Sequence, residues 1–118
     1  MTKEVAFYKA FWQLGRFSGN SNNLPEYVNW LNATFQIYKS MSKADKKANV
    51  EPMELTINVV LDQIYVFVAQ GNNLEIAFEE IKKEVPNLDS LFIRLNKQFP
   101  EKRISEKLLS YGYVIKSR

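Results

Sequence analysis

The stretch from Pro52 to Gln70, PMELTINVVLDQIYVFVAQ, decides the fold class. On a helical wheel advancing about 100° per residue, its apolar residues cover more than half of the circumference, and its polar residues gather on one side. The large apolar residues opposite that side are Ile57, Val60, Ile64, Phe67 and Val68. A helix with so wide an apolar surface packs against several neighbours, so the sequence predicts a central helix at about 52–70.

The polar side of this helix has two interpretations. It carries Glu51, Glu54, Asn58 and Asp62, which a helix near the surface would simply expose to water. The alternative is a carboxylate site for Mg²⁺, an ion that prefers oxygen ligands. Glu54 and Asp62 are about 12 Å apart along a helix axis, too far to share one ion unless Asn58 or another helix contributes. The sequence leaves open whether this polar side is solvated or functional.

Helical periodicity also marks five further segments, 3–17, 24–41, 74–84, 87–99 and 101–111. Pro25 lies at a first-turn position, and Gly71, Pro86, Pro100 and Gly112 separate or end segments. We therefore predict an all-α fold, a compact bundle of five to six helices around the central helix, in a single helical domain spanning 1–118. The segment 39–49 is expected to be a solvated connection, and 113–115 a short extended arm.

Composition excludes several classes of site. The 118 residues include neither cysteine nor histidine, which excludes disulfides, thiolate or imidazole metal sites and Cys or His nucleophiles. The N-terminus reaches charged residues at once, and the longest apolar run, 64–69, is far shorter than the ~20 residues that span a bilayer. We expect a cytoplasmic protein with no membrane partner, no cofactor, no metal and no catalytic residues.

The segment 54–84 carries a family resemblance. Glu54 and Asp62 lie on one helix, Gly71 follows, and LEIAFEE occupies 74–80. This order resembles the second half of all-α nucleotide pyrophosphohydrolases of the MazG type, in which an E-x-x-D helix precedes a glycine and an L-E-x-A-type helix. The family's E-E-x-x-E motif should fall on the second helical segment, yet 32–38, NATFQIY, contains no acid. The E-x-x-D pair is broken as well, because Asn58 or Leu55 occupies the acidic position. The resemblance implies a fold relative without catalysis; an active Mg²⁺-dependent enzyme is the less favoured version.

The C-terminal third is basic. Seven basic and two acidic residues give 94–118 a charge of +5, and the chain's total of +3 then leaves −2 for the rest. Such asymmetry attracts phosphate, and the segment is similar in outline to the end of a helix-turn-helix or winged-helix unit. DNA or RNA binding is therefore the alternative function, with the candidate residues Lys97, Lys102, Arg103, Lys107, Lys116 and Arg118.

An N-terminal group of aromatic residues gives the preferred function. One helix cannot turn both Phe7 with Phe11 and Tyr8 with Trp12 inward, and aromatic residues are favoured at protein interfaces. The sequence thus predicts a small non-enzymatic helical binding protein, an adaptor, inhibitor or regulator. Its size and aromatic content are similar to those of small accessory proteins of phages and plasmids. The expected partner is another protein or a second copy in a homodimer, contacted through Tyr8, Trp12, Phe17 and Trp30.

Overall fold

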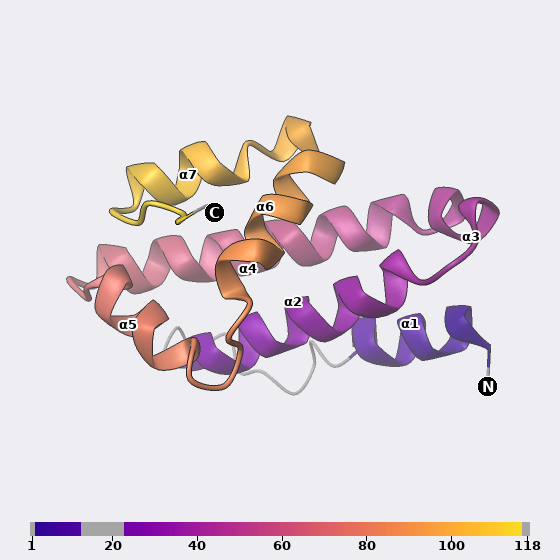
Figure 1. Cartoon of the computed structure of the whole chain (residues 1–118), viewed down its shortest axis with the longest axis horizontal. Helices are drawn as coiled ribbons and strands as arrows, with labels where there is room; N and C mark the ends of the chain where they lie inside the picture. Colours follow the sequence, from indigo (N-terminus) through magenta and orange to yellow (C-terminus); the bar gives the residue numbers. More distant parts are fainter. Residues whose placement is uncertain (1, 13–22, 117–118) are drawn as a thin grey trace. The chain divides into compact units, whose positions relative to one another are not determined.

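The computed structural model of the chain describes residues 2–12 and 23–116 (Figure 1). In these residues it contains seven α-helices, a 3₁₀ helix and no strand, so the all-α prediction is confirmed. The chain divides into two compact units, residues 1–60 and 61–118. One helix, α4 (Val50–Ala69), contributes its first half to the former and its second half to the latter. The single domain stays a prediction.

The first unit contains α1 (Lys3–Phe11), α2 (Leu24–Lys39), α3 (Lys43–Ala48) and the first half of α4. Helix α1 starts at Thr2, whose hydroxyl accepts a hydrogen bond from the Val5 N–H. Helices α1 and α2 lie side by side and run in opposite directions (Figure 1). The indole N–H of Trp30 on α2 donates to the carbonyl of Ala10 on α1 and joins the two helices.

The burial pattern confirms the helical periodicity predicted for 24–41, which covers α2 and the two residues after it. Tyr27, Leu31, Thr34, Tyr38 and Met41 are all buried, at the four- and three-residue spacings expected for one helix face. The first helix is shorter than the predicted 3–17 in the part that can be compared, since α1 ends at Phe11 and Trp12 is its C-cap. The rest of that prediction, 13–17, lies outside the described residues.

The expectation of a loop at 39–49 is wrong, because α3 lies within it. The Ser42 hydroxyl caps this helix by accepting a hydrogen bond from the Asp45 N–H at 3.2 Å. Ala and Lys, which fill most of its other positions, are good helix formers. None of its residues is buried, so it lacks the apolar period that marked the other helices.

The helix predicted at about 52–70 is confirmed as α4, with bounds within two residues of the expected ones. Ile57, Val60 and Ile64 are buried, whereas Phe67 and Val68 are only half-buried. Of the helices in the described part of the chain, α4 is the one long and apolar enough to cross a membrane by length and composition. The core helix of a soluble protein passes the same test, and the compartment stays a prediction.

The second unit contains the second half of α4, then α5 (Leu74–Ile81), α6 (Leu88–Gln98), the 3₁₀ helix η3 (Pro100–Lys102) and α7 (Ile104–Ser110). Helix α6 buries one face, in agreement with the helical periodicity of 87–99; its buried residues are Leu88, Leu91, Phe92 and Leu95. The helix predicted at 101–111 is divided in two. Arg103 separates η3 from α7, and its φ of 53° lies in the left-handed region.

Glycine ends α7 as the sequence predicts. Gly112 has a φ of +99°, and its N–H donates to the carbonyl of Leu109 at 3.0 Å. The N–H of Tyr113 donates to the carbonyl of Leu108 at 2.9 Å, which completes a Schellman motif. Tyr113 and Leu108 are both buried, and from 113 to 116 the chain forms neither helix nor strand. The motif thus fixes the direction in which the C-terminal tail leaves α7.

Candidate functional site

One face of α1 is apolar and exposed. Val5, Tyr8 and Trp12 follow one another at spacings of three and four residues, which places them on the same side of the helix. Their side chains are 45%, 41% and 73% exposed, whereas Phe7 on the same helix is fully buried. We call Val5, Tyr8 and Trp12 the α1 face. Large apolar residues grouped in this way are typical of surfaces that bind another molecule.

Aromatic packing beneath this face holds α1 against its own unit. The Phe7 ring lies 6.0 Å from the Tyr38 ring of α2 and 6.4 Å from the Phe11 ring. The exposed Trp12 ring meets Phe11 edge-on at 5.6 Å, and Tyr8 meets Phe7 edge-on at 6.1 Å. Each exposed ring therefore rests on a more deeply placed ring, which limits the entropy that it would lose on binding.

The four residues predicted to contact a protein partner lie in different environments. Tyr8 and Trp12 belong to the α1 face. Trp30 is 4% exposed and donates its indole N–H within the unit, so it lies in the core and is not accessible to a partner. Phe17 lies outside the described residues. The structure adds Val5, which the sequence reasoning missed because only aromatic residues were considered.

The predicted nucleic-acid residues are spread over α6, η3, α7 and the tail. Lys97, Arg103, Lys107 and Lys116 are exposed, Lys102 is partly exposed, and Arg118 lies outside the described residues. Arg103 forms an ion pair with Glu106, and Lys116 lies 3.9 Å from Glu79. In the described part of the chain, Arg94, Lys97 and Lys107 are exposed cations that form no ion pair.

A charged cluster anchors the C-terminal tail in the second unit. The hydroxyl of Tyr113 donates a hydrogen bond to one oxygen of Asp89, and Lys82 lies 3.3 Å from the other. Lys82 also pairs with Glu79 at 3.2 Å and lies 5.3 Å from the centre of the Tyr113 ring. We call Lys82, Asp89 and Tyr113 the tail anchor. The three residues are far apart in the sequence, and no local pattern indicated their contact.

The tail anchor changes the acidity of its members. Burial raises the pKa of Tyr113 to about 12, and the hydrogen bond to Asp89 adds to the rise, although Lys82 opposes it. Burial lowers the pKa of Lys82, but its contacts with Tyr113, Glu79 and Asp89 outweigh this effect and raise the pKa above the usual lysine value. Near neutral pH the cluster therefore consists of an ammonium, a carboxylate and a neutral phenol.

The polar side of α4 is partly solvated. Glu51 and Asp62 are exposed, and Glu54 and Asn58 are partly exposed. In the described residues, no three acidic side chains gather into a group that could hold a metal ion. These residues therefore supply no set of metal ligands in support of the resemblance to MazG-type enzymes. That resemblance stays a prediction.

Comparison with known proteins adds no relative. No protein-family model matches the chain, and no curated protein or solved structure is detectably similar to it.

The two tryptophans give a direct test of these placements. We expect Trp12→Ala to change the free energy of unfolding by less than about 1 kcal/mol, because Trp12 is mostly exposed. Trp30→Ala should cost about 3–5 kcal/mol, because it removes a buried ring. Urea unfolding followed by circular dichroism measures both. Equal losses from the two variants would contradict the assignment of Trp12 to the surface.

The tail anchor predicts a loss of stability in alkali. The folded chain holds the Tyr113 proton up to about pH 12, whereas an unfolded tyrosine releases it near pH 10. The contribution of the protonated Tyr113 to the free energy of unfolding is therefore complete below pH 10, and it is lost as the pH rises through 12. Burial also raises the pKa values of Tyr38 and Tyr111, so Tyr113→Phe removes only part of the effect.

Urea unfolding between pH 7 and 12 provides the measurement. Between pH 10 and 12, the free energy of unfolding should fall in both proteins. The fall should be smaller in Tyr113→Phe than in the wild type, by on the order of 2 kcal/mol. Parallel stability curves for the two proteins would show that Tyr113 is not a proton-holding part of the fold.

Proposed function

We propose that this chain is a small helical binding protein that contacts a partner protein through the α1 face. The observation that carries the proposal is the exposure of Val5, Tyr8 and Trp12 along one side of a helix that is held in its unit by the buried Phe7. Tryptophan and tyrosine are the residue types that most often dominate the energy of protein interfaces. The mostly exposed Trp12 would bury the largest apolar surface of the three on binding.

The surroundings of the α1 face indicate the chemistry of the partner surface. Lys3 and Lys9 are exposed on α1, where the ammonium of Lys3 donates a hydrogen bond to the carbonyl of Ser40, and Glu4, the acidic residue of this helix, accepts one from Asn49. A partner with an apolar pocket for Trp12 and carboxylates at its rim would match this arrangement. Opposite charges at the rim steer two proteins together and help to fix their orientation.

Site-specific photo-crosslinking in the native host tests the proposal. A photoreactive phenylalanine analogue at position 8 or 12 should give discrete adducts of defined mass. The same analogue at Ala33, an exposed position on α2 of the same unit, serves as the control and should give none of them. An adduct of twice the chain mass would identify a second copy as the partner, and any other discrete mass a different protein.

Two results would contradict this assignment. One is the same adduct pattern from positions 8, 12 and 33, and the other is no adduct from positions 8 and 12. A binding-defective variant sharpens the test, since Trp12→Ala should abolish the adduct formed at position 8 while the chain stays folded.

Nucleic-acid binding through the basic C-terminal third is the second candidate function. The observation in its favour is that Arg94, Lys97 and Lys107 are exposed and form no ion pair in the described part of the chain. Cations of this kind neutralise phosphates and release counterions, so the resulting affinity falls steeply with salt. The exposed face of α7 also carries Glu106 and Leu109. This composition favours contact with the phosphate backbone of a nucleic acid over sequence-specific recognition of its bases.

A salt titration with a labelled DNA duplex measures this activity. Affinity falls with salt, so the slope of log affinity against log salt is negative. It should become shallower by about 1–2 when Lys97 and Lys107 are both changed to Ala. The matched control changes Lys43 and Lys47, two exposed lysines of α3, and should leave that slope intact. An equal effect of both pairs, or no binding at low salt, would remove this candidate.

A further inference from the structure

An open pocket of about 540 Å³ lies at the beginning of α6, entirely within the second unit. Its lining includes Pro86 and Asn87 just before α6, Ser90, Ile93 and Arg94 from the first two turns of α6, and Lys116 from the C-terminal tail. A volume of this size is typical of pockets that hold small molecules. None of these residues belongs to the α1 face, which is the proposed contact with a partner protein.

Three polar side chains of the pocket share one side of α6. Asn87, Ser90 and Arg94 follow one another at spacings of three and four residues. In the part of the chain that the structure describes, none of the three side chains forms a hydrogen bond or ion pair. An amide, a hydroxyl and a guanidinium are thus available together to a ligand in the pocket.

The charge available in the pocket is positive. Asp89 also lines the pocket, but its carboxylate accepts the hydrogen bond from Tyr113 and pairs with Lys82. Glu79 is the carboxylate paired with Lys116, at 3.9 Å, and both side chains are mostly exposed. Such a pair contributes little and is easily exchanged for a better partner. Arg94 and Lys116 therefore remain as the two cations that can engage an anion.

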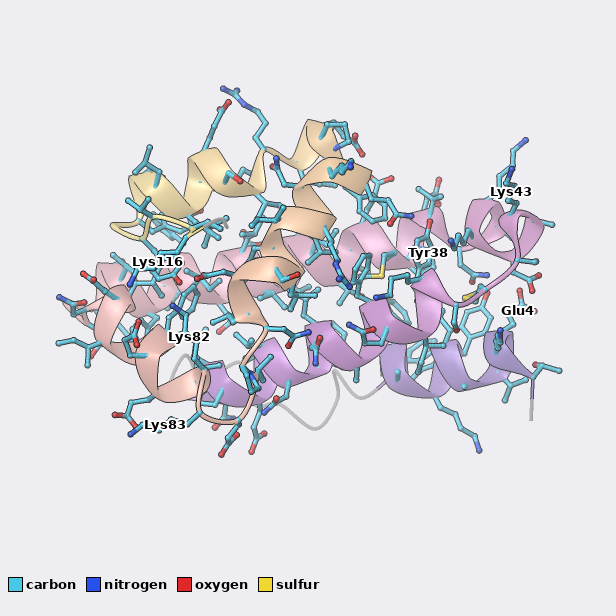
Figure 2. All side chains as sticks on the ribbon, in the orientation of Figure 1. Glu4, Tyr38, Lys43, Lys82, Lys83 and Lys116 are labelled. Atoms are coloured by element: carbon cyan, nitrogen blue, oxygen red, sulfur yellow. The ribbon has the colours of Figure 1, made fainter. Side chains whose placement is uncertain are left out.

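The tail anchor determines where Lys116 lies. Tyr113 is fixed by the Schellman motif and by its hydrogen bond to Asp89, and Lys116 follows three residues later. Figure 2 shows Lys116 near Lys82, in agreement with the approach of both ammonium groups to Glu79. The pocket thus has one cation on a helix and a second on a tail that is held by buried contacts.

We propose that this pocket binds a small phosphate monoester that carries an apolar group. The guanidinium of Arg94 can donate two parallel hydrogen bonds to phosphate oxygens, and Lys116 adds a second positive charge. Ser90 and Asn87 supply further donors. Pro86 and Ile93, which is 36% exposed, offer apolar surface for the group that the phosphate carries. The site is independent of the proposed protein interface, and either can fail without the other.

An NMR titration of the full chain with phenyl phosphate tests the site. Amide shifts should saturate and should concentrate at Ser90, Arg94 and Lys116. Arg94→Gln should weaken binding at least tenfold, and Lys116→Gln should weaken it as well. Lys83→Gln is the matched control, because it removes one exposed positive charge from the second unit outside the pocket and should leave the affinity unchanged.

Parallel titrations with inorganic phosphate and phenol test the two halves of the ligand. Each should bind more weakly than phenyl phosphate. Inorganic phosphate binding as tightly as phenyl phosphate would overturn the apolar half of the proposal. The site itself is refuted by shifts that do not saturate, by shifts spread equally over Lys97 and Lys107, or by wild-type affinity in Arg94→Gln. Because Arg94 is exposed, its variant should fold, and an unchanged amide spectrum away from the pocket verifies this.

Discussion

The apolar side of α4 is the constraint on which both units depend. Ile57, Val60 and Ile64 are buried, and burying a side chain of this kind contributes roughly 1.5–3 kcal/mol before the loss of entropy is counted. Because the helix is continuous from Val50 to Ala69, its buried residues belong to both units, Ile57 and Val60 to the first and Ile64 to the second. Helices α1 and α5 to α7 have at most eleven residues each, and helices so short are stable only when they are packed.

Periodicity predicted the fold well where burial decides the structure. The stripes of α2, α4 and α6 were visible in the sequence because their large apolar residues recur every three or four positions. Helix α3 was missed because its residues are exposed and its stability comes from Ser42 and from helix-forming side chains. The division of the last helix at Arg103 was also missed, since a left-handed arginine leaves no mark in an apolar pattern.

The candidate sites were less predictable, because residue type does not show which way a side chain points. Trp12 and Trp30 look equally suited to an interface, yet one is exposed and the other lies in the core. The tail anchor joins residues from α5, α6 and the tail, and the pocket beside it depends on the same long-range contacts. Such contacts follow from the packing of helices, which a single sequence does not specify.

Both ends of α7 are fastened to α6, although α7 has only seven residues. At its first turn Ile104 is buried, and the N–H of Ser105 donates a hydrogen bond to the side chain of Asn96 on α6. Beyond its last turn, Tyr113 is buried and donates its hydroxyl hydrogen to Asp89 on the same helix. We therefore expect α6 and α7 to open together in hydrogen exchange, with similar protection of their backbone amides.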